Sequence, residues 1–405
     1  MLLVSPARRR PRVALYSHDT CGLGHTRRNL RIAQALAASP LRADVLMLTG
    51  ARESNAFPIP LGVDLLSLPA LYKETDGGYR ARHLSFGIDD LLELRSQTLR
   101  SSLEAFAPDV FIVDNVPRGA MGELDATLHA LRSTSTRCIL GLRDVLDDPD
   151  AVAREWAARG NLEAIDGTFE EVWVYGDPTV YAADEAYAFP GWLRDRLTYT
   201  GYLDPTTGPL DPLAEPSLAL DVIPDGPLAL CAVGGGQDGG AIARAFAEAQ
   251  RPNGMAGLIL TGPFMDDRTR DAVAEAATQD HLHVARFSTA PGVLYERADR
   301  VVAMGGYNTV LELLVLGQRP LIVPREVPRR EQCIRADRLA ALGLLDVLSS
   351  ADATPNAIAD WLATPARPGP DARHQLDLGG LPHIVALVGR MISSPTSRFR
   401  SHVSA

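Results

Sequence analysis

The stretch that decides the fold is Met304-Gly305-Gly306-Tyr307-Asn308-Thr309-Val310-Leu311-Glu312, a glycine pair between two apolar runs. Residues 300–304 before it are typical of a buried parallel strand, and residues 320–324 are typical of the next one. Between them, Leu311, Leu314 and Val315 fall on one face of a helix. The stretch therefore predicts a strand, a glycine turn, a helix and a second strand.

The ends of this helix carry their own signals. Asn308 or Thr309 can cap its start, and Gly317 is a typical left-handed stop. A glycine turn that leads into a helix presents free backbone N–H groups and the positive end of the helix dipole, which suits a diphosphate. Glu312 follows one to two turns later, where its carboxylate can accept hydrogen bonds from sugar hydroxyls.

Working outward, strand-like runs alternate with helical patterns through the whole chain, which predicts parallel sheets covered on both faces. The 405 residues favour two domains. A Gly/Pro-rich segment at 200–209 predicts the boundary, and residues 365–370 form a second Pro-rich break before a final helix from about 380 to 391. The fold class expected is α/β, with two Rossmann-like, doubly wound domains.

Composition limits the function classes. The net charge of −10 argues against a nucleic-acid partner, and the chain has no apolar run long enough to span a membrane. The four cysteines lack metal-ligand spacing and are typical of reduced thiols in a cytoplasmic protein. The first residues place their charges after a short apolar piece, unlike a signal peptide. The Ala-, Arg- and Pro-rich usage suggests a bacterial genome of high GC content.

A second glycine turn, Gly22-Leu23-Gly24-His25, follows the first predicted strand. It places His25 at a helix N-terminus on the carboxyl edge of a parallel sheet, where ligands bind. The positive end of a helix disfavours a protonated imidazole, so we expect His25 to accept a proton. Asp114 and Asp144 each end a strand at this edge and could orient His25. We prefer Asp114, because its strand is the more apolar.

Each of these features has a simpler interpretation. The GxGH turn alone is a short motif, and a glycine turn with a histidine is more often only a turn. Glu312 by itself is typical of a solvated helix residue, and the arginines near residue 330 are typical of a charged surface. The polar loop at 73–82 could cover a site or be a plain surface loop.

Taken together, the two halves resemble the GT-B glycosyltransferases, and within them the MurG-like branch. Residues 305–312, Pro324, residues 329–332 and Arg335-Ala336 look like the sugar-nucleotide donor motif of that branch. The loop at 22–25 resembles the glycine loop that opens the acceptor domain, and residues 234–237 resemble the loop that opens the donor domain. The GxGHxxR form also occurs in PseG-like nucleotide-sugar hydrolases.

The resemblance implies a role for each matching residue. His25 would deprotonate the acceptor hydroxyl, Glu312 would hold the donor ribose, Gln332 would contact sugar hydroxyls, and Phe287 would lie beside the nucleobase. The full set implied for catalysis is His25 and Asp114, with Gly22 and Gly24 in the N-terminal loop. The set implied for donor binding is Gly235, Gly236, Phe287, Gly305, Gly306, Asn308, Thr309, Glu312, Arg329 and Gln332.

The resemblance thus implies an inverting, metal-independent glycosyltransferase that uses a nucleotide sugar, with UDP expected, a hydroxyl acceptor and no cofactor. Residues 1–200 would form the acceptor domain, completed by a helix at about 376–400, and residues 201–375 would form the donor domain across a cleft. A cytoplasmic location with peripheral membrane contact is compatible with this reading. A nucleotide-sugar hydrolase and a non-catalytic nucleotide-sugar binding protein remain as alternatives.

Overall fold

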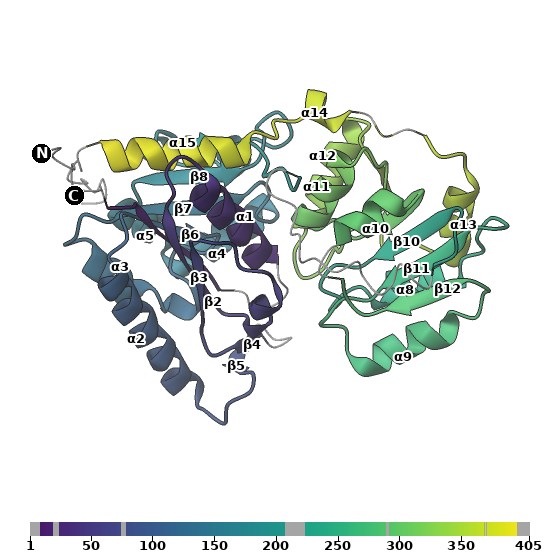
Figure 1. The fold of residues 1–405 in the computed structure, drawn as a ribbon, viewed down its shortest axis with the longest axis horizontal. Helices are drawn as coiled ribbons and strands as arrows, with labels where there is room; N and C mark the ends of the chain where they lie inside the picture. Colours follow the sequence, from purple (N-terminus) through teal and green to yellow (C-terminus); the bar gives the residue numbers. More distant parts are fainter. Residues whose placement is uncertain are drawn as a thin grey trace, which may run out of the picture.

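The computed structural model describes residues 9–18, 24–73, 78–206, 223–288, 291–367, 369 and 371–394, without the side chains of Ala56 and Lys73. Over these ranges, two parallel sheets occupy the two halves of the chain, with helices packed on both faces (Figure 1). This arrangement confirms the predicted fold class of two doubly wound α/β domains.

In the described part of the N-terminal half, seven strands run parallel in the order β3-β2-β1-β6-β7-β8-β9. The chain begins in the middle at β1, builds out to β3 and then returns to β6 on the other side of β1. The order reverses between β1 and β6, so their carboxyl ends form the ligand-binding crevice typical of such sheets. The strand bounds are β1 Arg12–Ser17, β2 Asp44–Thr49, β3 Val63–Ser67, β6 Val110–Asp114, β7 Arg137–Arg143, β8 Glu171–Tyr175 and β9 Leu197–Tyr199.

The C-terminal half repeats this plan. Among its described residues, six parallel strands have the order β12-β11-β10-β13-β14-β15, so the reversal falls between β10 and β13. In each sheet, a strand next to the reversal leads into one of the glycine-rich segments noted in the sequence. The strand bounds are β10 Leu228–Ala232, β11 Ala256–Leu260, β12 Leu282–Ala285, β13 Arg300–Ala303, β14 Leu321–Ile322 and β15 Asp346–Val347.

The helices connect these strands and cover the sheets. Those of the N-terminal half are α1 Gly24–Ala38, α2 Ile88–Phe106, α3 Asp125–Leu131, α4 Pro149–Arg159, α5 Asn161–Thr168, α6 Ala183–Ala186 and α7 Gly191–Arg194, with 3-10 turns at Arg52–Ala56 and Ala120–Gly122. Those of the C-terminal half are α8 Gly240–Glu248, α9 Asp267–Ala276, α10 Pro291–Arg297, α11 Tyr307–Val315, α12 Glu331–Ala341, α13 Pro355–Ala363, α14 Ala372–Gln375 and α15 Gly380–Ser393.

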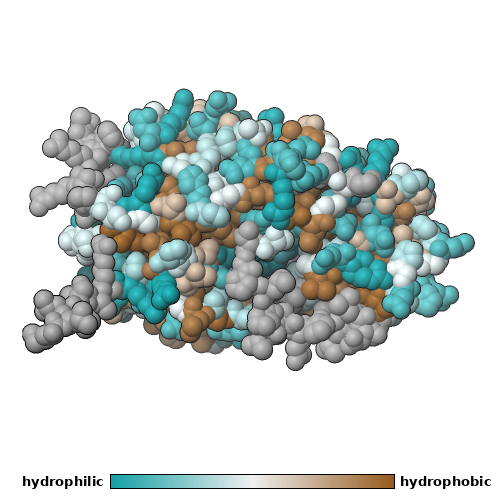
Figure 2. Space-filling view, turned by 45° about the horizontal axis from the view of Figure 1, so that its top comes forward, coloured by the Kyte–Doolittle hydropathy of each residue, from teal (hydrophilic) through white to brown (hydrophobic). Residues whose placement is uncertain are grey.

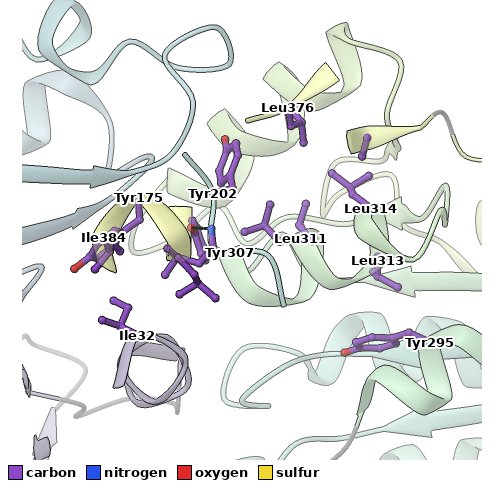
Figure 3. Packing of buried hydrophobic residues seen from close by; sticks show 14 of the residues in the cluster. Ile32, Tyr175, Tyr202, Tyr295, Tyr307, Leu311, Leu313, Leu314, Leu376 and Ile384 are labelled. Carbon is purple, nitrogen blue, oxygen red and sulfur yellow. Dashed lines mark hydrogen bonds between the residues drawn. The ribbon is translucent and has the colours of Figure 1, made fainter. Parts of the chain in front are cut away.

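In the central strands β1, β6, β10 and β13, successive residues are buried on opposite faces, as a parallel sheet covered on both sides requires. In β1, Val13 and Leu15 face a core shared with α1 and α15, whereas Ala14 and Tyr16 face a second core with α2 and α3. The first of these cores continues into the C-terminal domain through Tyr307 and the apolar face of α11 (Figure 3). The two domains are therefore joined by packed side chains as well as by chain crossings.

The last helix, α15, lies on the N-terminal domain, where it packs against α1 and β6 (Figure 1). Its residues Ile384, Leu387 and Val388 are buried in the shared core. The chain thus crosses from the N-terminal domain after β9 and returns to it before α15. Figure 2 shows one face of the molecule, on which hydrophobic residues appear among hydrophilic ones over both domains.

Two features near the surface complete the fold. A hairpin of β4 Leu71–Lys73 and β5 Tyr79–Ala81 forms from the polar loop at 73–82, whose residues 74–77 lie outside the described ranges. None of the helices in the described part of the chain is long and apolar enough to cross a membrane.

Candidate active site

A cavity of about 280 Å³ lies between the two domains, where the carboxyl ends of both sheets meet. The N-terminal domain contributes the start of α1, Phe57 and Arg143, and the C-terminal domain contributes the glycine turns, the start of α11 and the loop after β14. Of the residues predicted from the sequence, it is lined by Gly24, His25, Gly235, Gly236, Phe287, Gly306, Asn308, Thr309 and Gln332.

His25 is held by a buried carboxylate. Its Nδ1 lies 2.5 Å from Asp114 Oδ2, and the side chain of Asp114 is fully buried at the end of β6. The preferred orienting residue therefore lies where the sequence predicted it. Because Nδ1 is engaged, Nε2 is the ring nitrogen that can exchange a proton with a molecule in the cavity.

Arg28, one turn further along α1, holds the same carboxylate. Its Nη2 donates to both oxygens of Asp114, at 2.8 and 2.6 Å, and also lies 2.8 Å from His25 Nδ1. Burial by itself would raise the pKa of Asp114, but the charges of Arg28 and His25 outweigh it and hold the pKa well below its ordinary value. The carboxylate bonded to His25 is thus a permanent anion, held in place by a buried cation.

Part of the opposite wall is glycine backbone. After β10, Gly234 and Gly236 have φ values of +65° and +95°, and Gly262 after β11 has +80°. A Cβ on Gly236 would lie 2.2 Å from the carbonyl oxygen of Thr261, so the two turns touch backbone to backbone. Glycine is required here for this close approach, and the turn stays open toward the cavity.

The helix α11 begins differently from the prediction. Gly306 is its N-cap, and neither Asn308 nor Thr309 caps it, because both already lie inside the helix. The N–H groups of residues 307–309 precede the first helical hydrogen bond, from Val310 N to Gly306 O. A Cβ on Gly306 would meet nothing within 4 Å. The helix start therefore presents backbone donors to open space, as the diphosphate interpretation requires.

Asn308 and Glu312 instead reach across to the N-terminal domain. Asn308 Nδ2 donates to the carbonyl oxygen of Gly24 at 3.0 Å. Glu312 is buried, and its Oε1 accepts from Arg27 and Arg31 of α1, each at 2.6 Å, while its Oε2 has no partner in the structure. Glu312 is thus not a solvated helix residue, and it does not line the cavity in which the ribose contact was predicted.

Arg329 and Gln332 lie on the loop and helix that follow β14. Arg329 donates to Glu155 of α4 at 2.8 and 3.0 Å and does not line the cavity. Gln332 lines the cavity, and its Oε1 accepts from the backbone N–H of Arg325, which leaves its amide nitrogen as a donor. Arg329 therefore forms an ion pair between the domains in this structure and does not lie at the predicted donor site.

The contacts that Asp144, Arg335 and Tyr307 make across the domain boundary were not predicted from the sequence. Asp144, the orienting candidate not preferred, forms a buried pair with Arg335 of α12 at 2.6 and 2.8 Å across the domain boundary. Tyr307 packs beside Tyr202 at that boundary (Figure 3). The guanidinium groups of Arg28 and Arg335 lie over the Tyr307 ring. In the sequence these residues are marked only as polar types near apolar stretches, and that signal does not indicate their partners.

The cavity is rich in positive charge. Six arginines and two carboxylates line it among the described residues, namely Arg27, Arg28, Arg143, Arg286, Arg325 and Arg335, with Asp238 and Glu331. Arg325 pairs with both lining carboxylates, Asp238 at 2.9 Å and Glu331 at 2.6 Å. Arg27, Arg28 and Arg335 are paired with Glu312, Asp114 and Asp144 behind the lining, which leaves Arg143 and Arg286 as the positive charges that suit an anionic ligand. Gly22 lies outside the described residues, and the described part of the chain holds no cluster of metal-ligand side chains.

Comparison with known proteins gives the fold a name. No protein-family model and no curated protein sequence matches the chain. Solved structures do match it over almost its whole length. The calicheamicin glycosyltransferase CalG4 superposes with a TM-score of 0.60 at 15% identity, covering 96% of this chain and 100% of that one. The chain has the GT-B fold.

Other structures with this fold differ in activity. MurG of Acinetobacter baumannii matches with a TM-score of 0.54 at 16% identity, covering 94% of this chain and 99% of that one. A putative UDP-N-acetylglucosamine 2-epimerase of Listeria monocytogenes matches with a TM-score of 0.60 at 12% identity, covering 95% and 97%. At these identities the likeness establishes the fold and leaves the reaction to be argued from the site.

Proposed function

We propose that this protein is an inverting glycosyltransferase that moves a sugar from a nucleotide sugar, with UDP as the nucleotide, to a hydroxyl acceptor. The observation that carries the proposal is the placement of His25, oriented by Asp114, across one cavity from the start of α11 and the glycine turn after β10. A proton acceptor thus faces a cradle of backbone donors for a diphosphate.

In this reaction the imidazole of His25 takes the proton of the acceptor hydroxyl at Nε2. The acceptor oxygen bonds to the anomeric carbon of the sugar as the bond from that carbon to the diphosphate oxygen breaks. The electron pair leaves with the nucleoside diphosphate, whose negative charge is stabilised by the N–H groups of residues 307–309. A single displacement of this kind inverts the anomeric centre.

The donor would lie along the C-terminal wall. Phe287, which is 39% exposed at the cavity after β12, would contact the nucleobase. Glu312 would accept from the ribose through Oε2, which requires its buried side chain to turn toward the cavity. Gln332 would donate its amide to sugar hydroxyls, and Glu331, buried beside it with Oε2 unpartnered, offers an acceptor to the same sugar. We further propose a MurG-like enzyme that uses no metal or other cofactor and lies in the cytoplasm, a location compatible with peripheral contact with membranes.

A thermal-shift screen tests the donor assignment. UDP, dTDP and GDP are each added to the protein, because a ligand at about one hundred times its Kd stabilises the folded state by about 2.7 kcal/mol. We expect UDP to raise the melting temperature the most. If none of the three raises it, the proposed nucleotide-sugar function is wrong.

Product analysis with the matching nucleotide sugar then separates the rival activities. A transferase releases nucleoside diphosphate and leaves the sugar on a hydroxyl acceptor. A PseG-like hydrolase releases nucleoside diphosphate and free sugar from the start, with acceptor making no difference. A binding protein releases neither. We expect release that rises when a pool of candidate acceptors is added.

A further inference from the structure

Arg143 stands apart from the other arginines of the cavity. Arg27, Arg28, Arg325 and Arg335 each have a carboxylate oxygen within 3.0 Å. Arg286 is exposed and donates to a backbone carbonyl. Arg143, at the end of β7, has its closest carboxylate at 3.7 Å, on the same Glu331 oxygen that Arg325 already occupies.

The other nitrogen atoms of the Arg143 guanidinium also make few hydrogen bonds. Nη2 donates to the carbonyl oxygen of Leu146 at 3.0 Å, and Nε is buried without a partner. The side chain is 17% exposed and lines the cavity. Burial, together with the neighbouring charges of Arg335, Arg329 and Arg28, lowers the pKa of Arg143 against the opposing charge of Glu331. A buried cation without a full partner is costly, and a bound anion would remove that cost.

The position of Arg143 indicates where on the substrates the bound anion would be carried. It belongs to the N-terminal wall, next to Glu331 and therefore beside the sugar end of the proposed donor site, whereas the diphosphate cradle is formed by α11 and the turn after β10. Resting on the proposed function, we infer that Arg143 binds a carboxylate or phosphate group near the site of transfer, carried by the transferred sugar or by the acceptor. Nη1 of the guanidinium, whose nearest carboxylate oxygen lies 3.7 Å away, can donate a charge-assisted hydrogen bond to such an oxyanion.

The first arm of the test measures anion binding directly. Inorganic phosphate is titrated into UDP-saturated protein, with sodium chloride at equal ionic strength as the reference, and the melting temperature is followed. We expect Arg143→Gln to weaken the apparent phosphate affinity at least about tenfold, as the loss of charge-assisted hydrogen bonds implies. Arg143→Lys keeps the charge and should retain part of the affinity. Equal phosphate affinities in wild type and Arg143→Gln overturn the inference.

Stability without ligand separates this role from a structural one. If Arg143 were a structural partner of Glu331, its loss would lower the melting temperature. We expect Arg143→Gln to melt at or above the wild-type temperature in the absence of anions, since Glu331 keeps Arg325 as its partner. A clear fall in melting temperature in both Arg143→Gln and Arg143→Lys contradicts the inference.

The second arm finds the source of the anion. UDP-glucose and UDP-glucuronic acid differ by a carboxylate on the sugar, and their affinities are compared by calorimetry. If the wild type prefers UDP-glucuronic acid and Arg143→Gln abolishes that preference, the anion is carried by the transferred sugar. If phosphate binding depends on Arg143 but the wild type shows no preference for UDP-glucuronic acid, the anion is carried by the acceptor. Arg286→Gln removes one positive charge from the same cavity and should leave the ratio of the two affinities unchanged. Failure of UDP itself to bind would count against the proposed function, and phosphate binding by the free protein would still test Arg143.

Discussion

Asp114 serves two partners, so its replacement should damage the fold as well as the reaction. Its carboxylate is fully buried, bonded to His25 and held by Arg28, whose side chain is 3% exposed. Asp114→Asn leaves the Arg28 cation buried without a counter-charge, which typically costs about 3–5 kcal/mol. We expect a loss of that order in urea denaturation.

Matched variants show whether the buried pair is the cause. Arg28→Met added to Asp114→Asn removes the stranded cation and should recover part of the lost stability. Glu104→Gln breaks an exposed pair with Arg100 on α2 and should cost less than about 0.5 kcal/mol. If Asp114→Asn unfolds at the wild-type urea concentration, the pairing described here does not exist in solution.

The pKa of Asp114 also fixes a pH dependence. The folded-state pKa of Asp114 lies below the ordinary value for an aspartate. The carboxylate therefore stabilises the folded state fully at pH values above the ordinary pKa, and this contribution is lost as the pH falls toward the folded-state pKa. The difference in unfolding free energy between wild type and Asp114→Asn should be constant at neutral pH and shrink below about pH 4. A difference that grows with acidity would contradict the assigned charge state.

At this scale the sequence predicts positions better than partners. His25 and Asp114 could be paired because each follows a strand at the same sheet edge. The ion pair of Glu312 with Arg27 and Arg31 could not be predicted, because it depends on how closely α1 and α11 approach across the domain boundary. For the same reason, Arg329 was expected at the donor and lies against Glu155.

At the scale of the element, the start of α11 allows a sharp comparison of adjacent glycines. Gly306 lines the cavity and a Cβ on it would meet nothing within 4 Å, whereas a Cβ on Gly305 would lie 3.0 Å from Gln332 Cβ. We expect Gly306→Ala to fold normally and to lose about 1–3 kcal/mol of nucleotide-binding free energy through steric conflict with the diphosphate. Gly305→Ala should lower stability instead, because it pushes against α12.

Gly191→Ala is the matched control for Gly306→Ala, because its added Cβ also meets nothing and it lies on α7, outside the cavity. Its nucleotide affinity, measured by calorimetry, should equal that of the wild type. If Gly306→Ala binds nucleotide as well as Gly191→Ala does, the diphosphate does not lie at the start of α11.

The element itself could be predicted from the spacing of its apolar residues, but its first residue could not. Asn308 and Thr309 are good capping types, and local preference alone favours them at the N-cap. In the folded protein Asn308 bonds to Gly24 across the cavity, and Gly306 takes the cap position. The stop at Gly317 was predicted correctly, since its φ of +71° is a local requirement that only the glycine supplies easily.

On the scale of the whole molecule, the last helix should stabilise the first domain. Ile384 of α15 is fully buried in the core shared with α1 and β1. Ile384→Ala should cost about 2–5 kcal/mol of unfolding free energy and increase hydrogen exchange in β6 and α1. Leu342→Ala, at a residue that is 40% exposed, should change stability by no more than about 0.5 kcal/mol.

Hydrogen exchange that rises only in the C-terminal domain of the Ile384→Ala protein would contradict the position of α15.

The two-domain plan could be predicted from the sequence because alternating strands and helices dictate it locally. The fit between the domains could not, since Asp144 with Arg335 and Tyr307 with Tyr202 are brought together only by the relative placement of two separate sheets.

The central claim is that one domain supplies the base and the other holds the donor. It is tested most directly by measuring nucleotide affinity and sugar transfer on the same His25→Ala protein. Because the cradle for the diphosphate belongs to the C-terminal domain, we predict a UDP affinity within a few-fold of wild type. Transfer should fall by about 10²–10⁴-fold, the usual effect of removing a general base. Near-normal transfer by His25→Ala, at an unchanged UDP affinity, would contradict the account.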